Sequence, residues 1–340
     1  MSGVAVMGAG IAIMGAGAWG TALAQALASD GTPVLLWARE PALAQEINQA
    51  RTNTPYLPGV HLAGTIRATA DIAELAGAGV VLAVVPAQYL GAALAALPAY
   101  TGAGQRDLVL CAKGIERGTG RLMLDVAREA VPDAALAVLS GPTFAREVAL
   151  GLPTAVTLAC AGGEAQWQRL APVIARGHLR PYYTDDVIGA EIGGAVKNVL
   201  AIACGVVEGL GLGENARAAL IARGFAEMER LGVAKGARAE TLSGLCGLGD
   251  LVLTCASNAS RNYALGRALG MGQSAEEALA GKLSVAEGAA TAPVLAAVAR
   301  EMGLAMPIAE AVAALLAGEV SAQAVAQGLL ARPLRAEVAR

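Results

Sequence analysis

Two lysines are the side chains of this sequence best suited to move a proton. The chain holds only four lysines, at positions 113, 197, 235 and 282, and the other 21 of its 25 basic residues are arginines. A lysine ammonium can shift its pKa when it is buried, whereas an arginine stays charged. Lys113 and Lys197 stand in Gly-rich or apolar sequence, so both are candidates for proton transfer. An exposed lysine, or one whose stem lies along an apolar surface, is the ordinary alternative.

The rest of the composition narrows the chemistry that the chain can perform. Histidine occurs only at His61 and His178, so histidine-based acid-base chemistry has little support. Five separate cysteines without a C-x-x-C pair predict neither a disulfide framework nor a zinc site, and we expect no metal.

A polar segment in the second half of the chain supplies candidates for substrate binding. Asp250 and Thr254 lie in it, followed by Ser260, Arg261 and Asn262. An arginine beside an asparagine at a helix start offers a charged fork, an amide and free N–H groups to a phosphate. Ser260 is equally suited to be the N-cap of the helix that follows, and the two roles are compatible.

A Gly-rich turn near the N-terminus predicts an element that holds a nucleotide. It lies between an apolar strand, residues 11–14, and a helix that begins near Ala18. Gly15 permits the tight turn, Gly17 leaves room for a diphosphate, and Gly20 lets the helix approach the strand. This G-x-G-x-x-G spacing with a strand before it and a helix after it is the dinucleotide fingerprint.

The first ten residues have no predicted role. Residues 4–10 nearly repeat residues 11–17, but only the second copy leads into a long helical pattern. We expect a leader or an extra turn. Because no basic residues precede the apolar run, we do not expect a secretory signal.

The residue after the second expected strand bears on cofactor choice. Residues 33–37 form an apolar strand, and Arg39 and Glu40 stand just beyond it. In this fold an acid at that point binds the ribose 2'-hydroxyl, whereas an arginine accommodates a 2'-phosphate. Arg39 therefore favours NADPH, although the adjacent Glu40 weakens that preference, and a solvent-facing arginine is the alternative.

Alternating apolar strands and helical stretches predict an α/β domain with a mostly parallel, doubly wound sheet. Near-continuous apolar runs are typical of strands buried on both faces. Five such runs follow the second strand, at residues 80–86, 108–114, 136–143, 155–160 and 180–184. Ligands bind beyond the carboxyl ends of such strands, which is where Pro86, Lys113 and residues 140–143 fall. The prolines of residues 53–60 predict a loop.

From residue 189 onward the sequence predicts helices alone. We therefore divide the chain into a dinucleotide-binding Rossmann domain, residues 1–188, and an all-helical (all-α) substrate domain, residues 189–340. The substrate site of such a protein is expected in the cleft between the two parts. Lys197 falls in an apolar helix of the second domain, where burial would push its ammonium toward the neutral form.

Composition excludes several kinds of partner. The net charge is -3 and no basic run is interleaved with aromatic residues, so nucleic acid and membrane surfaces are not expected as partners. The uncharged run over residues 75–105 contains Pro86 and Pro98, which favours a strand and a helix over a membrane span. We expect a cytoplasmic protein, and its Ala-rich apolar helices are compatible with a homodimer.

Six short motifs in a fixed order carry a family resemblance. They are GAGAWGTA at residues 15–22, CAKG at 111–114, SGPTFA at 140–145, GAVKNV at 194–199, GLGDLVLTC at 247–255 and SRN at 260–262. Together they resemble bacterial NAD(P)-dependent glycerol-3-phosphate dehydrogenase from about residue 11 to residue 306. The resemblance implies reversible reduction of dihydroxyacetone phosphate to sn-glycerol 3-phosphate by NADPH or NADH in the cytoplasm, which feeds phospholipid synthesis.

The resemblance also implies roles for individual residues. Lys197 corresponds to the family's catalytic lysine, which donates a proton to the carbonyl oxygen, and Lys113 and Asp250 act with it. Substrate contacts are implied for Lys113, Gly141, Thr143, Lys197, Asn198, Asp250, Thr254, Ser260, Arg261 and Asn262, with the last three as a phosphate clamp. The expected cofactor contacts include the Gly-rich turn and Arg39 described above. The full set is Gly15, Gly17, Ala18, Trp19, Gly20, Arg39, Lys113, Ala145, Arg261, Val285 and Glu287. Many members carry serine where this chain has Ala18, so one hydroxyl contact to the diphosphate is expected to be absent.

Two other functions stay open. A related two-domain reductase would act on a 3-hydroxy acid or a ketopantoate-like substrate, whose carboxylate would not require the segment Ser260 to Asn262. A protein of a different class would be a non-catalytic NADPH sensor that binds the dinucleotide with one domain and a partner with the other. Such a sensor has no use for Lys, Asp, Thr and Arg gathered at a cleft.

Overall fold

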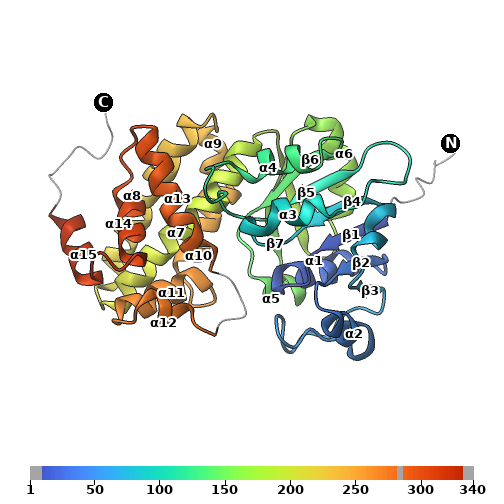
Figure 1. Cartoon of the computed structure of the whole chain (residues 1–340), viewed down its shortest axis with the longest axis horizontal. Coiled ribbons are helices and arrows are strands. Elements are labelled where there is room, and N and C mark those ends of the chain that lie inside the picture. Colours follow the sequence, from blue (N-terminus) through green and yellow to red (C-terminus); the bar gives the residue numbers. More distant parts are fainter. Residues whose placement is uncertain (1–9, 282–285, 332–340) are drawn as a thin grey trace.

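The computed structural model describes residues 10–281 and 286–331. Its strands lie together in one half of the molecule, and helices α7 to α15 make up the other half (Figure 1). The strands form one eight-stranded sheet in the order β3-β2-β1-β4-β5-β6-β7-β8. Their bounds are β1 Gly10–Met14, β2 Val34–Trp37, β3 Ile66–Thr69, β4 Ala78–Ala83, β5 Asp107–Leu110, β6 Ala135–Ser140, β7 Thr154–Cys160 and β8 Leu179–Thr184.

Both faces of this sheet are buried, which explains the continuous apolar runs. Along β1, Ile11 and Ile13 face a core shared with α1, α2 and α6, whereas Ala12 and Met14 face a second core shared with α3 and α4. The helices of this half are α1 Ala18–Leu27, α2 Pro41–Ala50, α3 Leu90–Ala95, α4 Met123–Ala130, α5 Ala145–Ala149 and α6 Gly163–Ile174, with short 3-10 turns η1 Ile72–Gly77 and η2 Ala87–Tyr89.

The predicted α/β class with a mostly parallel sheet is confirmed. Parallel pairing joins every neighbouring pair of strands except β6 and β7, which are antiparallel. Strand β3 escaped prediction because it is four residues long and its Arg67 interrupts the apolar pattern. The predicted run over residues 108–114 was too long, because β5 ends at Leu110 and Lys113 lies beyond it.

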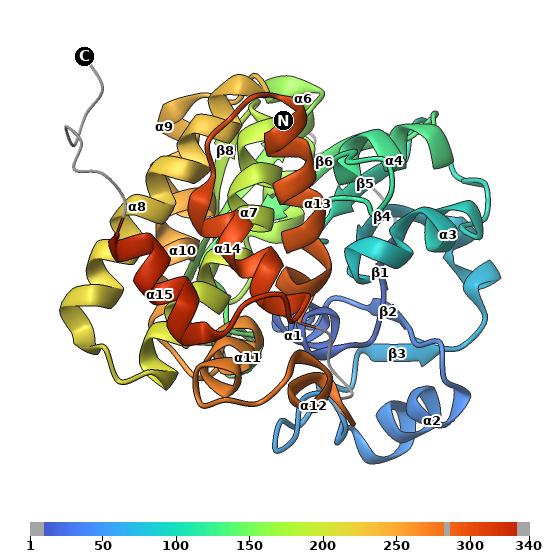
Figure 2. The same ribbon diagram turned by 60° about the vertical axis from the view of Figure 1, so that its left-hand side comes forward.

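Helix α7, Val187–Gly209, is the central element of the helical half (Figure 2). It packs against α8, α10, α11, α13 and α14. The close approach of α11 depends on Gly205, since a Cβ there would lie 2.1 Å from the carbonyl oxygen of Tyr263. The other elements of this half are α8 Gly213–Ala234, α9 Ala239–Leu242, the π-helical turn η3 Leu245–Gly249, α10 Asp250–Cys255, α11 Arg261–Gly270, α12 Ala275–Leu279, α13 Glu287–Glu301, α14 Pro307–Leu316 and α15 Ala322–Leu330.

Within the described ranges, α7 is also the one helix long and apolar enough to cross a bilayer. Its most apolar window is 94% buried inside the fold, so its composition reflects a core position rather than contact with lipid. The uncharged run over residues 75–105 folds as strand β4 between short helices, as predicted.

All five cysteines lie within the described ranges, and all are buried and free. Burial raises the pKa of Cys111 to about 12 and the pKa values of Cys160 and Cys246 to about 11. Since the thiolate is the reactive form, these thiols are chemically quiet in the folded protein.

Candidate active site

One carboxylate, that of Asp250, binds the two lysines that the sequence singled out. Lys197 Nζ lies 2.7 Å from Asp250 Oδ1, and Lys113 Nζ lies 2.7 Å from Asp250 Oδ2. Thr254 completes the group, because its Oγ1 accepts a hydrogen bond from Lys197 Nζ at 3.0 Å. Asp250 is fully buried and the two lysines are nearly so. The prediction that these four residues lie together agrees with this geometry.

Three separate elements deliver these side chains. Lys113 comes from the loop after β5 in the sheet half, Lys197 from the middle of α7, and Asp250 from the first residue of α10. The π-helical turn η3 precedes Asp250, and such turns are frequent at functional sites. The cluster therefore lies where the sheet half meets the helical half.

The ammonium of Lys197 is poised to lose its proton. Burial, aided by the positive charge of Lys113, lowers the pKa of Lys197 to about 8, while Asp250 acts in the opposite direction. At neutral pH, Lys197 is protonated in most molecules, and it can release that proton. A lysine tuned in this way is suited to general acid-base catalysis.

A chain of amides links the cluster to the start of α11. Asn262 Nδ2 donates to Asn198 Oδ1 at 2.9 Å, and Asn198 Nδ2 donates to the carbonyl oxygen of Lys113 at 3.4 Å. Asn262 also accepts a hydrogen bond from the backbone N–H of Gly288 at 2.9 Å. Both asparagines are buried, so their amides have a fixed orientation beside the lysines.

Glu287 crosses between the two halves near the same cluster. Its Oε1 accepts the backbone N–H of Ala87 at 3.1 Å. Burial raises its pKa, and the charges of Arg261, Lys113 and Lys197 all act on it in the opposite direction. The positive charges of these three residues therefore act on one carboxylate, and Arg261 itself is exposed.

Ser260 is the N-cap of α11, where its Oγ accepts the N–H of Tyr263 at 3.2 Å.

The cofactor contact predicted at Val285 lies outside the described residues.

The end of β6 forms another wall of the site. The carbonyl oxygen of Gly141 accepts hydrogen bonds from Lys113 Nζ at 3.2 Å and from Thr143 Oγ1 at 3.3 Å. The hydroxyl of Ser140 is buried and has no hydrogen-bond partner among the described residues. Ala145 begins α5 a short way beyond. The sequence predicts Ser140 at a strand end and indicates no role for it.

The Gly-rich turn has the shape that a diphosphate requires. A Cβ on Gly15 would lie 2.5 Å from the carbonyl oxygen of Val84, and one on Gly20 would lie 1.8 Å from that of Gly15, so both positions exclude a side chain. The Cβ position of Gly17 is open space instead. Ala18 and Trp19 begin α1 directly behind it, and their N–H groups belong to the unpaired first turn of a helix. The turn therefore fits a dinucleotide.

Two further polar groups lie at this turn, the amide of Asn53 and the indole N–H of Trp19. Asn53 is fully buried and donates to the carbonyl oxygen of Ala16 at 2.9 Å and to Thr21 Oγ1 at 2.7 Å, so it holds the turn in place. The sequence predicts only a loop at residues 53–60 and carries no local signal for this contact. The indole N–H of Trp19 is buried without a partner among the described residues.

Arg39, the predicted determinant of cofactor choice, lies apart from the lysine cluster. Its side chain is 79% exposed and pairs with Glu40. The exposed position agrees with the solvent-facing alternative as well as with a role in binding a 2'-phosphate.

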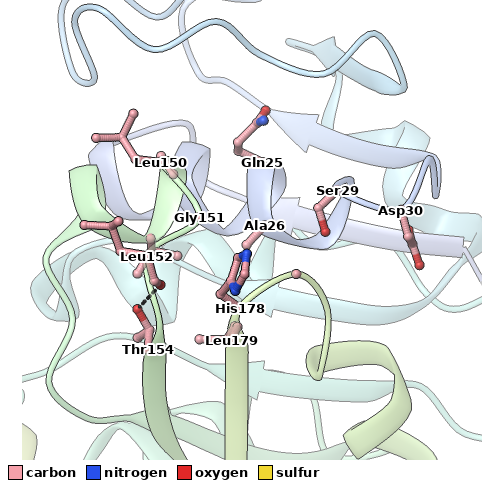
Figure 3. A pocket seen from close by; sticks show the side chains of 13 residues that line it. Gln25, Ala26, Ser29, Asp30, Leu150, Gly151, Leu152, Thr154, His178 and Leu179 are labelled. Carbon is pink, nitrogen blue, oxygen red and sulfur yellow. Dashed lines mark hydrogen bonds between the residues drawn. The ribbon is translucent and has the colours of Figure 1, made fainter.

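Two surface hollows of the described part of the chain lie away from the predicted site residues. One, of about 480 Å³, lies between the end of α1 and the loop from Leu150 to Thr154, with His178 projecting between Ala26 and Leu152 (Figure 3). The other, of about 580 Å³, lies beside Tyr182 and Arg238. No group of three His, Cys, Asp or Glu side chains suited to a metal is found in the described ranges.

A Gly-rich turn on a doubly wound sheet, joined to helices that supply a lysine-aspartate-lysine cluster, defines a nicotinamide-dependent dehydrogenase of two parts. The comparisons specify which one. The model for the N-terminal part of NAD-dependent glycerol-3-phosphate dehydrogenase matches residues 10–166, and the model for its C-terminal part matches residues 186–327. The chain belongs to the NAD(P)-dependent glycerol-3-phosphate dehydrogenase family, a family of oxidoreductases.

Individual relatives agree with this assignment. The chain is 66% identical to a glycerol-3-phosphate dehydrogenase [NAD(P)+] of Novosphingobium aromaticivorans, over 95% of this chain and 96% of that one. It is 64% identical to the protein of the same name from Erythrobacter litoralis, over 97% and 98% of the two chains. The crystal structure of glycerol-3-phosphate dehydrogenase from Coxiella burnetii superimposes with a TM-score of 0.89 at 40% identity, covering 95% of this chain and 98% of that one.

Proposed function

We propose that this protein catalyses the reversible reduction of dihydroxyacetone phosphate to sn-glycerol 3-phosphate with NADPH or NADH. The observation that carries the proposal is the buried Lys113-Asp250-Lys197 arrangement, which contacts both halves of a fold suited to a dinucleotide. The bound cofactor supplies or accepts the hydride. The product would serve as a glycerophospholipid backbone in the cytoplasm.

We assign the proton to Lys197. As the carbonyl oxygen of the substrate gains negative charge, the ammonium of Lys197 donates to it, and in the reverse direction the neutral amine removes the proton. Asp250 and Thr254 hold the nitrogen in place through bonds of 2.7 and 3.0 Å. Lys113 adds positive charge beside the developing alkoxide and is itself held by Gly141 and Asp250.

We assign the phosphate of the substrate to the start of α11. Arg261 supplies an exposed guanidinium, Asn262 and Asn198 supply amides, and Ser260 fixes the first turn of the helix. Binding energy from this non-reacting group would hold the reacting carbon in place. Gly141 and Thr143 would contact the substrate from the opposite wall.

We assign the dinucleotide to the Gly-rich turn, with Gly15, Gly17 and Gly20 shaping it and Ala18 and Trp19 presenting backbone N–H groups. The further cofactor contacts in this proposal are Arg39, Lys113, Ala145, Arg261 and Glu287.

The decisive experiment is an absorbance assay of the nicotinamide band with each reduced cofactor and dihydroxyacetone phosphate. We expect substrate-dependent loss of absorbance and formation of sn-glycerol 3-phosphate. Turnover of a 3-hydroxy acid or ketopantoate-like substrate in place of the phosphate ester would favour the related reductases. Tight NADPH binding without oxidation would favour the sensor.

Three broader proposals accompany the activity. We propose that residues 1–188 form the dinucleotide-binding domain and residues 189–340 the catalytic domain, which is supported by the end of β8 at Thr184 and the start of α7 at Val187. We also propose a cytoplasmic location and a homodimer. Sedimentation equilibrium would test the homodimer, and a mass of about 34 kDa at all concentrations would contradict it.

A further inference from the structure

Immediately after β2, an acid and a base stand side by side where the ribose of a dinucleotide is expected. Strand β2 ends at Trp37, and the backbone N–H of Gly15 donates to the carbonyl oxygen of Trp37 at 3.1 Å. The end of β2 is therefore fixed directly against the Gly-rich turn. Arg39 and Glu40 follow within three residues.

These two side chains bind each other. Arg39 Nη2 and Nε lie 2.6 and 2.9 Å from the same oxygen, Oε1 of Glu40. The side chains are 79% and 45% exposed, and an ion pair this open to water contributes little to stability. The carboxylate of Glu40 and the guanidinium of Arg39 therefore bind each other, but either can exchange its partner for a ligand.

Glu40 has no competing structural role in the local fold. It is the N-cap residue of α2, but its side chain makes no capping hydrogen bond, and Pro41 follows as the first helical residue. Glu40 is the largest influence that raises the pKa of Arg39, and the hydroxyls of Tyr56 and Tyr89 act weakly in the same direction. Among the described residues, the Arg39 side chain donates its two hydrogen bonds to Glu40.

In this fold an acid after the second strand accepts the ribose 2'-hydroxyl of NAD, and an arginine accommodates the 2'-phosphate of NADP. This chain carries both an acid, Glu40, and an arginine, Arg39, and their opposite charges neutralise each other. A 2'-phosphate must draw Arg39 away from Glu40 and lie near a second negative charge. A 2'-hydroxyl requires no such change.

We propose that Glu40 is a specificity-determining residue that competes with the 2'-phosphate for the Arg39 guanidinium, and thereby keeps NADH usable beside NADPH. Glu40 serves as the acceptor for the ribose hydroxyl of NADH, and Arg39 serves as the donor to the phosphate of NADPH. The inference rests on the dinucleotide site proposed above.

The test is direct nucleotide binding by isothermal titration calorimetry on the full-length protein. The probes are adenosine 2',5'-bisphosphate and adenosine 5'-monophosphate, which differ only in the 2'-phosphate. We expect Glu40→Gln to tighten the bisphosphate by roughly tenfold and to leave the monophosphate unchanged or weaker. We expect Arg39→Gln to remove the preference for the bisphosphate. In the assay, the NADPH to NADH ratio of kcat/KM should move in the same directions.

A matched control is Glu74→Gln, which frees Arg67 from another partly exposed ion pair, 60% and 36% exposed, on the same half of the molecule. The binding ratio should not change in this variant. An unchanged ratio in Glu40→Gln, or a change equal to that of the control, overturns the inference. Failure to reduce dihydroxyacetone phosphate would refute the proposed activity instead, because the binding ratio is measured without substrate.

Discussion

At the scale of single residues, the proposed chemistry depends on the net charge of the buried cluster formed by Lys113, Asp250 and Lys197. Asp250 balances one of two ammonium groups, so the Lys113-Asp250-Lys197 cluster carries an excess positive charge that a developing alkoxide would neutralise. Because both lysines bind the carboxylate of Asp250, its substitution should disturb both of them together.

Lys197→Ala should remove nearly all turnover while nicotinamide cofactor still binds. Loss of a general acid typically costs 10²–10⁴ in rate, so we expect kcat to fall on the order of 10³-fold. Stopped-flow cofactor binding beside steady-state rates would check this, with Lys235→Ala at the end of α8 as the control. Near-normal kcat would remove Lys197 from its proposed role.

The pKa of Lys197, lowered to about 8 chiefly by burial, predicts the pH dependence of the reaction. Reduction requires the protonated lysine, so kcat/KM for dihydroxyacetone phosphate should fall as the pH rises through about 8. Oxidation of sn-glycerol 3-phosphate requires the neutral amine and should gain over the same interval. Rate profiles from pH 6 to pH 10 in both directions would measure this, and parallel profiles would contradict it.

At the scale of elements, α7 decides whether Lys113 can reach the cluster. A Cβ on Gly194 would lie 3.0 Å from Ser140 Oγ and 3.2 Å from Cγ of Lys113. The stem of Lys113 therefore passes over a bare patch of the helix backbone. Gly194, which lies in the GAVKNV motif, therefore leaves the space that the Lys113 side chain occupies.

Gly194→Ala should displace Lys113 and lower kcat/KM for the substrate by roughly tenfold, since small misplacements at a reacting centre are costly. Alanine favours a helix over glycine by about 1 kcal/mol, so a loss of activity would not simply reflect helix propensity. Steady-state kinetics and thermal melts would separate the two effects. Gly328→Ala in α15, where a Cβ meets nothing within 4 Å, is the control. Equal kinetics in both variants would count against the positioning role.

The elements themselves were largely predictable from the sequence. Strands buried on both faces are continuous apolar runs, so the sheet and the Gly-rich turn followed from local patterns. What local patterns could not give is contact between distant segments. Along the sequence, the charged residues nearest to Lys197 are Glu191 and Glu208, whereas the fold places Asp250 beside its ammonium. Likewise, nothing local indicates that Asn53 holds the carbonyl of Ala16.

At the scale of the whole molecule, buried carboxylates join separate segments. Glu191 in α7 accepts the backbone N–H of Leu124 at the start of α4 with a distance of 2.9 Å, and so connects the helical half to the sheet half. Within the helical half, Glu227 accepts the N–H groups of Ile308 and Ala309 at the start of α14.

Stability should therefore fall as the pH rises from about 5 to 8. Burial raises the pKa of Glu191 from 4.5 to about 8 and that of Glu227 to about 7, so in this interval the folded protein binds more protons than the unfolded chain. Each buried carboxyl can contribute at most about 1.4 kcal/mol per pH unit. Urea unfolding at several pH values should show a shallower slope for Glu191→Gln than for the exposed control Glu319→Gln. The same slope in both would argue against this source of pH dependence.

The complete burial of the native thiols makes the molecule convenient for spectroscopy. A single cysteine introduced at an exposed site on each half would be the group that a maleimide dye reaches first, without removal of Cys111, Cys160, Cys204, Cys246 or Cys255. Energy transfer between two such dyes would then report whether the halves move relative to each other during a catalytic cycle. The protein without an introduced cysteine can therefore serve as the unlabelled control.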